Sequence, residues 1–352
     1  MMKKRETYET VLRTPKKITF LILVLAQLSA FNDVYSQENI FKAGASISNI
    51  TPNLESGIVG NFGTPPPAKH IHDQLSARSL VLNDGTNTLV FVICDNVSIN
   101  REIFDAAKQR LQEKTKIPSS YMLMAATHTH SGTSAGGEGD KRRGWHPNDP
   151  LDSYQQYLVN RIVDGVQVAI NNMEPAVIGW GSVNAPEHVF NRRWVMKKPV
   201  KNPFGELDPV QMNPGIGNPN LAEPSGPTDP EVSFISVQSK SGRPLALLAN
   251  YSLHYVGGLP NDHISADYFA VFADRVQALL QADRQDPPFV GIMSNGTSGD
   301  INNIDVKGSS QKLPPYQKMN LVAKDLAERV YKATPSIKYH NWVPIKGLQS
   351  EI

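Results

Sequence analysis

The twelve residues LMAATHTHSGTS, at positions 123–134, constrain the fold of this chain more than any other stretch. Their apolar first half predicts a buried strand that ends at His128 and His130. Side chains two residues apart in an extended strand leave from the same face, so both imidazoles are expected to point into one pocket. A His-x-His pair at a strand end is a common beginning of a metal site. The alternative is structural, with one histidine capping the strand and the other in water.

Apolar periodicity predicts an α/β fold for the rest of the chain. The apolar run at 88–95 is typical of a central strand, and residues 100–115 repeat apolar side chains at helical spacing. With the strand before His128 they predict a β-α-β unit whose carboxyl edge carries the histidines. Further strands are expected at 41–52, 77–82, 176–186, 231–239, 245–258 and 289–305, the last running into a polar turn, and further helices at 154–172, 268–282 and 316–333. We therefore predict a mixed, largely buried β-sheet with flanking helices in a single domain.

Residues 190–230 are crowded with Pro, Gly and Asn. An ordered loop of this length is usually functional, so we expect an irregular flap or rim that faces the substrate. Disorder is the alternative for this stretch.

The first 36 residues have the composition of an export signal. They carry six basic and three acidic residues and an apolar run of thirteen residues at 18–30, too short to cross a bilayer core of ~30 Å. This pattern predicts a signal peptide over 1–36 and a secreted or periplasmic protein, with an uncleaved membrane anchor as the alternative. Of the total net charge of +2, the remainder of the chain then holds −1, so no nucleic-acid partner is expected. The single Cys94 gives no thiolate metal site.

Three predicted strands end in polar groups that suit one centre. They are the strand before His128 and His130, the strand that ends at His254, and the strand that runs into the turn at 295–302. A catalytic Zn²⁺ takes three protein ligands and keeps a position for water, whose pKa it lowers to ~7. A satisfied core histidine is the alternative for His254. The sequence contains no P-loop or GxGxxG fingerprint.

Seven segments of the chain occur in the same order as in one known family. They are HDQLSARSLVLNDG (72–85), ATHTHSG (126–132), FNRR (190–193), GPTDPEV (226–232), ANYSLH (249–254), ISADY (264–268) and SNGTSGDIN (294–302). In these segments the chain resembles the catalytic domain of the neutral/alkaline, non-lysosomal ceramidases, and the resemblance covers roughly residues 41–333. The resemblance is most specific in the order of three features: HTHSG, then His254, then the GD turn.

The resemblance implies a zinc amidase that cleaves the N-acyl bond of ceramide to a fatty acid and sphingosine. His128 resembles the first zinc ligand of the family and His254 the second, while His130 resembles the neighbouring catalytic histidine. Arg192 resembles the arginine that helps to polarise the amide carbonyl and steadies the oxyanion. Asp300 is similar to the aspartate of the family's catalytic GD turn.

The chain departs from this family pattern in two ways. The family has a serine that acts at the scissile amide where this chain has Asn302, and an amide side chain is no nucleophile. The family also supplies a Glu and a Tyr to zinc from further along the chain, and no matching segment precedes Ile352. We therefore expect the domain at 37–352 to lack part of its metal site and to bind zinc weakly.

The sequence thus predicts a zinc-dependent hydrolase of the ceramidase type that acts on ceramide or a related small-molecule or lipid N-acyl amide. The alternative is an exported, non-catalytic descendant that binds lipid or glycan. Contact with a membrane surface and the oligomeric state stay open at this point.

Overall fold

The computed structural model describes residues 40–350, apart from 55, 61–62, 137–149 and 309–312. The predicted signal peptide at 1–36 lies outside the described residues. Residues from Asn39 onward form one compact unit.

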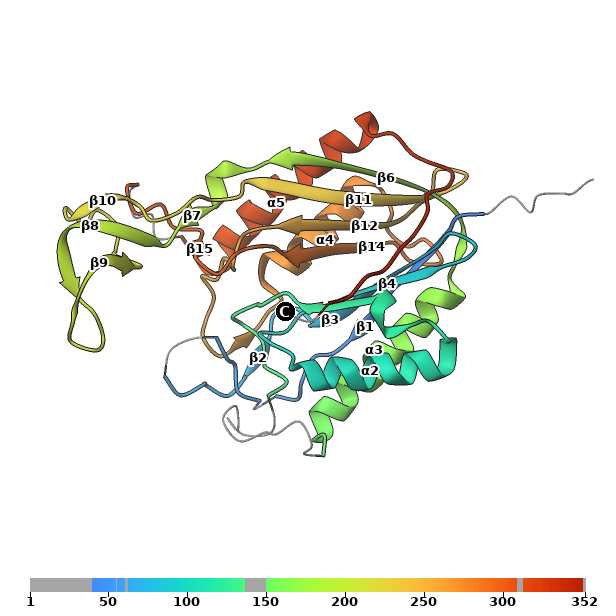
Figure 1. Ribbon diagram of the computed structural model, residues 1–352, viewed down its shortest axis with the longest axis horizontal. Coiled ribbons are helices and arrows are strands. Elements are labelled where there is room, and N and C mark those ends of the chain that lie inside the picture. Colours follow the sequence, from blue (N-terminus) through green and yellow to red (C-terminus); the bar gives the residue numbers. More distant parts are fainter. Residues whose placement is uncertain (1–39, 55, 61–62, 137–149, 309–312, 351–352) are drawn as a thin grey trace, which may run out of the picture. The chain divides into compact units, whose positions relative to one another are not determined.

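An eight-stranded sheet forms the centre of this unit (Figure 1). Its order is β14-β12-β11-β6-β1-β3-β4-β5. The strands are β1 (Lys42–Asn49), β3 (Ser76–Asn83), β4 (Thr88–Cys94), β5 (Met122–Ala126), β6 (Glu174–Asn184), β11 (Glu231–Ser239), β12 (Pro244–Tyr251) and β14 (Val290–Asn295). β4 and β5 pair in parallel, as do β12 and β14, whereas the other neighbours are antiparallel. The predicted mixed sheet is therefore confirmed.

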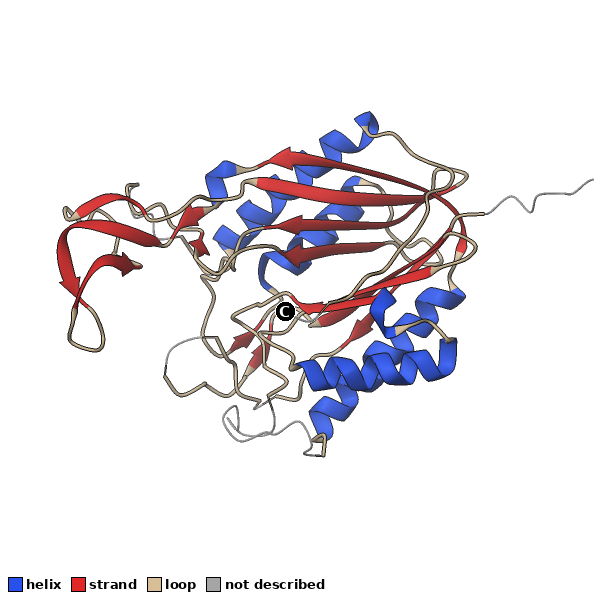
Figure 2. Cartoon of the chain, in the orientation of Figure 1, coloured by secondary structure: helices blue, strands red, loops and turns tan. Residues whose placement is uncertain are grey.

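Two pairs of helices cover this sheet (Figure 2). α2 (Arg101–Thr115) and α3 (Ser153–Asn171) share a core with β3 and β4, whereas α4 (Asp267–Leu279) and α5 (Gln317–Ala333) share one with β11 and β12. The apolar positions of α2 that predicted a helix, Ile103, Phe104, Ala107 and Leu111, are its buried residues. α3 begins with a capping box between Asp152 and Gln155. Single turns of 3₁₀ helix occur at Ser119–Tyr121, Pro186–His188 and Thr334–Ser336.

The sheet folds back on itself. In β3, Ala77 and Val81 face the α2–α3 core, and Leu80 and Leu82 face a third core between the two halves of the sheet. Ala246 of β12 and Ile292 of β14 enter this same inner core from the opposite half. β14 and β5, the two ends of the strand order, thereby contact each other. The ends of β5, β12 and β14 lie together although their residues are far apart in the sequence.

Residues 190–230 contain more regular structure than their composition predicts. β7 (Phe190–Asn191) pairs with β15 (Ile301–Asn302), and β8 (Arg193–Lys201), β9 (Leu207–Met212) and β10 (Leu221–Pro224) form a separate three-stranded sheet, at the left of Figure 1. The prediction of an irregular loop is wrong here. Another short parallel pair joins β2 (His70–Ile71) to β13 (His263–Ile264).

No helix within the described part of the chain has both the length and the apolar character that a membrane crossing requires.

Candidate metal centre

The candidate site lies where the chain leaves β5, β12 and β14. Asn295, the last residue of β14, donates hydrogen bonds from Nδ2 to the carbonyl of Thr127, 3.0 Å away, and to that of His254, 3.1 Å away. The side chain of Asn295 thus joins the segment after β5 to the segment after β12. The sequence predicts that Asn295 lies at this strand end, but it does not predict that its side chain bonds to both segments.

His128 stands in a turn and not in the strand that precedes it. β5 ends at Ala126, and His128 has a φ of +66°, in the left-handed region that a residue with a Cβ rarely adopts. Its backbone N–H donates to the carbonyl of Asn96, 3.0 Å away. The expected extended His-x-His geometry is therefore wrong, because this turn and not strand pleating aims the ring of His128. Backbone strain of this kind concentrates at functional sites.

The imidazoles of His128 and His254 are both anchored through Nδ1. Nδ1 of His128 lies 2.7 Å from the carbonyl of Val97, and Nδ1 of His254 lies 2.9 Å from that of Ser298. A carbonyl only accepts, so each Nδ1 carries the proton and each Nε2 keeps a free lone pair. Such backbone contacts orient metal-binding histidines in known sites.

Three Nε2 atoms converge at the centre of the site. Nε2 of His130 lies 3.1 Å from Nε2 of His128 and 3.1 Å from Nε2 of His254. A single ring proton on His130 can satisfy only one of these two lone pairs, so at least one lone pair is left for a cation at the centre. Separations of 3.1 Å are close to the roughly 3.3 Å that Zn–N bonds of ~2.0–2.1 Å give in a tetrahedron. The three histidines could therefore hold a metal ion.

Burial keeps the rings of His130 and His254 in the neutral form that a metal needs. Burial first, and then the neighbouring His128 and His254, lower the pKa of His130 to about 3, although the backbone of Gly60 acts in the opposite sense. Burial is also the main cause that lowers the pKa of His254. Neutral imidazole is the ligand form of histidine.

Two residues that hold the ring of His130 were not predicted from the sequence. Tyr255 stacks on it, with ring centroids 4.0 Å apart and planes 9° apart. Gly60 lies so close that a Cβ there would come within 2.7 Å of the ring, and its φ of +115° also favours glycine. The position of Tyr255 directly after His254 was a usable signal for it, whereas nothing local in the sequence marks Gly60.

Arg192 lies between β7 and β8 and is fixed to the turn before β15. Its backbone N–H donates to the carbonyl of Asp300, 2.7 Å away, and its guanidinium donates to the carbonyl of Gly299. Its positive charge acts to lower the pKa values of His130 and His254, so its electric field reaches the histidines. Arg192 is thus bonded to Gly299, which directly follows Ser298, the residue whose carbonyl anchors Nδ1 of His254.

Asp300 and Asn302 make their described contacts away from the imidazoles. Oδ2 of Asp300 accepts a hydrogen bond from Nδ2 of Asn191, 3.2 Å away. Nδ2 of Asn302 donates to Oδ1 of Asn213 at 3.2 Å, and Oδ1 of Asn302 accepts from the backbone of Ile304. Asp300 therefore holds the strand that presents Arg192, and Asn302 joins β15 to the end of β9.

Unpaired polar atoms gather around the histidines. Of eight buried side-chain atoms that have no hydrogen-bond partner among the described residues, four belong to this region: Thr127 Oγ1, His130 Nδ1, Arg192 Nε and Asn295 Oδ1. Buried polar groups are normally satisfied, so such a concentration is typical of a site that receives a polar ligand or water.

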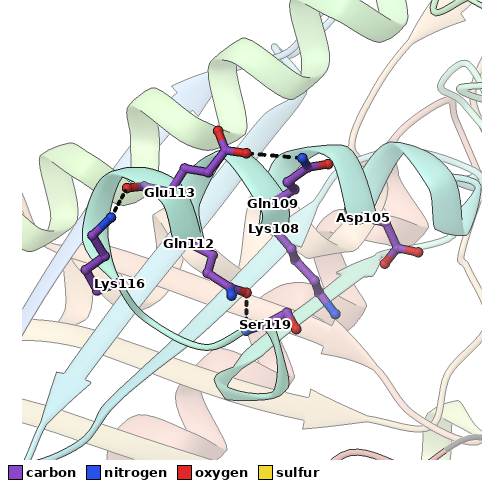
Figure 3. Close-up of a pocket in the computed structure, with 7 residues that line it drawn as sticks. All are labelled: Asp105, Lys108, Gln109, Gln112, Glu113, Lys116 and Ser119. Atoms are coloured by element: carbon purple, nitrogen blue, oxygen red, sulfur yellow. Dashed lines mark hydrogen bonds between the residues drawn. The ribbon is translucent and has the colours of Figure 1, made fainter.

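A surface depression of about 620 Å³ lies elsewhere, along α2 (Figure 3). Its side chains bond mainly within the helix and the following turn, as in the contact of Gln109 with Glu113 at 3.1 Å and of Gln112 with the backbone of Ser119 at 3.3 Å. This depression is the polar face of an amphipathic helix.

Comparison with protein families assigns the chain. Residues 41–314 match the model of the neutral/alkaline non-lysosomal ceramidase N-terminal domain. The chain belongs to this family. Both histidines of the segment ATHTHSG, His128 and His130, direct Nε2 toward the same centre as His254. The resemblance noted from sequence motifs is confirmed.

Solved ceramidase structures have the same fold. A crystal structure of neutral ceramidase from Pseudomonas aeruginosa superposes with a TM-score of 0.63 at 19% identity, and it covers 83% of this chain. A structure described as a ceramidase complexed with C2 gives a TM-score of 0.59 at 20% identity and covers 85% of this chain. The aligned part is 44% of each ceramidase, so the chain spans less than half their length. The predicted α/β fold class is confirmed by this likeness.

Proposed function

We propose that this chain is a zinc-dependent hydrolase of the ceramidase type that cleaves the N-acyl amide bond of ceramide or of a related N-acyl compound. Family membership supports the reaction class. The observation that carries the proposal is the convergence of three Nε2 atoms from the segments after β5 and β12. Following the composition of residues 1–36, we also propose that the protein is exported.

Within the three histidines, we assign His128 and His254 to the metal and His130 to catalysis. The Nδ1 atoms of His128 and His254 are fixed by backbone carbonyls, which is the usual arrangement behind a ligand. His130 is held instead by ring stacking on Tyr255 and by close packing against Gly60. Its Nε2 faces the same centre, where it can exchange a proton with a reacting group.

A zinc ion bound here would supply Lewis acidity, which polarises a carbonyl and lowers the pKa of water. Arg192 would bind the oxyanion that develops when the amide carbonyl is attacked, because its Nε–H is buried and unpaired among the described residues. Asp300 would keep Arg192 in place through Asn191. The acyl group would pass to water, because Asn302 offers no hydroxyl.

Asn302 also favours a second candidate function. Because this amide is bonded to Asn213 and Ile304, the chain lacks a nucleophile at the position where the family has serine. A non-catalytic protein that binds an N-acyl lipid or a glycan would retain the histidine centre without turnover.

Titration of the purified protein with zinc tests the proposal. We expect binding to saturate at about one zinc ion per chain, and the zinc-saturated protein to release fatty acid from a ceramide or another N-acyl amide, an activity that a chelator abolishes. His128→Ala and His254→Ala should each lose the metal, whereas His188→Ala, outside the centre, should keep it. Unchanged zinc content in both ligand variants would refute the site. Saturable ceramide binding without fatty acid release would instead favour the non-catalytic function.

A further inference from the structure

The sheet formed by β8, β9 and β10, here called the arm, has one packed face. Trp194 and Met196 of β8 form a small core with Val306, which follows β15. The ammonium of Lys307 lies 5.0 Å from the centre of the Trp194 ring. This face attaches the arm to the segment after β15.

The tip and the opposite face of the arm are apolar and exposed. Phe204 in the turn between β8 and β9 is 90% exposed, and Leu207 at the start of β9 is 70% exposed. Val210 pairs with Val195, and Met212 pairs with Arg193; Val210 and Met212 are 36% and 47% exposed. Single exposed apolar residues are ordinary, but a run of them along one hairpin marks an interaction surface.

The turn that carries Phe204 is ordered by Asn202. Oδ1 of Asn202 accepts from the backbone N–H groups of Phe204, 2.9 Å away, and Glu206, 3.0 Å away. Nδ2 of Asn202 donates to Asp208 at 3.1 Å. The phenyl ring is therefore presented to solvent by a built turn, so little conformational entropy is lost when it becomes buried.

Lysines accompany this apolar tip. Lys197, Lys198 and Lys201 on β8 are all exposed. With Arg193 they make four basic residues between Arg193 and Pro224, against the three acidic residues Glu206, Asp208 and Glu223. Aromatic and aliphatic side chains beside lysines are the composition of segments that lie in the interface of a bilayer, where the apolar groups enter and the ammonium groups meet lipid phosphates.

The exposed face of the arm is continuous with the candidate site. Met212 is followed by Asn213, whose backbone N–H donates to the carbonyl of Arg192, 2.7 Å away, and whose side chain accepts from Asn302. A partner that covers Met212 would therefore reach the neighbourhood of Arg192.

We propose that the arm docks the protein on a lipid bilayer, with Phe204 and Leu207 inserted among the acyl chains. A second copy of the chain is the other candidate occupant, but both outer strands of the arm carry proline, Pro209 in β9 and Pro224 in β10, and pairing in β10 also shifts register. Proline lacks the N–H that strand addition needs. Docking does not depend on zinc or turnover, so this inference goes beyond the proposed hydrolase.

Flotation of the purified protein with vesicles tests the docking. Vesicles of phosphatidylcholine with 30 mol% phosphatidylglycerol are suitable probes. We expect the partition coefficient to fall at least tenfold for the double variant Phe204→Asp/Leu207→Asp. Leu321→Asp, at a similarly exposed leucine on α5, should change it less than twofold. Equal partition of the wild type and the double variant would overturn the proposal.

A second variant keeps the proposal open to refutation if the charged one fails to fold. Phe204→Trp should gain fluorescence that vesicles shift to the blue and that lipids brominated on the acyl chain quench, after subtraction of the wild-type spectrum. Absence of that extra quenching would contradict insertion. Concentration-dependent dimerisation that Phe204→Asp/Leu207→Asp abolishes, without vesicle binding by the wild type, would assign the arm to a second copy instead.

Discussion

The described part of the chain holds two histidine clusters, and one of them has the geometry of a metal site. The inner triad consists of His128, His130 and His254. The outer cluster consists of His70, His72 and His263 with Tyr316, around the pairing of β2 and β13. Both clusters begin from a His-x-His pair in the sequence. The two clusters differ in the partners that their ring nitrogens contact.

In the outer cluster, both ring nitrogens of His263 face other partners. Nδ1 of His263 bonds to the hydroxyl of Tyr316, and its Nε2 lies 3.8 Å from Oδ1 of Asp262. The ring of His72 stacks on Tyr316 with centroids 3.8 Å apart. In the inner triad, by contrast, backbone carbonyls take the Nδ1 protons and leave Nε2 lone pairs facing one point. A metal site therefore depends less on the number of histidines than on which nitrogen each one leaves free.

The largest expected effect breaks the inner triad. His128→Ala/His254→Ala should lower zinc affinity by at least about 100-fold, since it removes two ligands where loss of a supporting contact alone costs 10- to 100-fold. Competition with a chromogenic chelator measures this. The matched variant His70→Ala/His263→Ala should keep the affinity within about twofold. A similar loss in both double variants would mean that the two clusters do not differ as described.

The next effect distinguishes a ligand from a catalytic residue within the triad. His130→Ala should retain about one zinc ion per chain and lose amide hydrolysis by roughly 100-fold or more, as for loss of a general base. His72→Ala should leave both quantities unchanged. Loss of zinc from His130→Ala would make His130 the third ligand and would correct the assignment of roles.

A smaller effect concerns the support of each cluster. Asn295→Ala removes two hydrogen bonds and leaves the carbonyls of Thr127 and His254 without them, so the free energy of unfolding should fall by about 2 kcal/mol. Tyr316→Phe removes a single contact to His263 in the more open cluster and should cost less than about 1 kcal/mol. Urea denaturation of the metal-free protein compares the two variants. Equal losses would contradict the distinct role given to Asn295.

The two clusters also show how much of the candidate site can be predicted from the sequence. Spacing alone describes His70-Ile71-His72 as well as His128-Thr129-His130, and what favours the second pair is the apolar strand before it and the family segment ATHTHSG around it. Even there the expected extended backbone was wrong. His128 has a φ of +66°, and its backbone N–H donates to the carbonyl of Asn96. The meeting with His254 depends on the folding of the sheet that brings β5 against β14, and no local pattern encodes such a contact.

The fold was more predictable where burial is periodic. The residues Ile103, Phe104, Ala107 and Leu111 predict α2 because one face of a helix packs on the sheet. The arm was not predictable, since its prolines and glycines are typical of loops and its strands are short. Its order comes from distant contacts, such as Trp194 with Val306 and β7 with β15. Propensity gives way to tertiary packing in such segments.

The smallest expected effect isolates the contact of Gly60 with His130. Alanine is strained at both Gly60 (φ +115°) and Gly63 (φ +95°), but a Cβ at Gly60 would meet the His130 ring at 2.7 Å, whereas a Cβ at Gly63 would meet nothing within 4 Å. Both variants should therefore lose about 1 kcal/mol from backbone strain. Gly60→Ala should lose about 1 kcal/mol more, because the ring must leave its place against Tyr255. Comparison of the two unfolding curves with imidazole NMR signals measures the difference. Identical stabilities together with an unmoved His130 signal would show that the backbone at Gly60 yields instead, and that stacking on Tyr255 alone holds the ring.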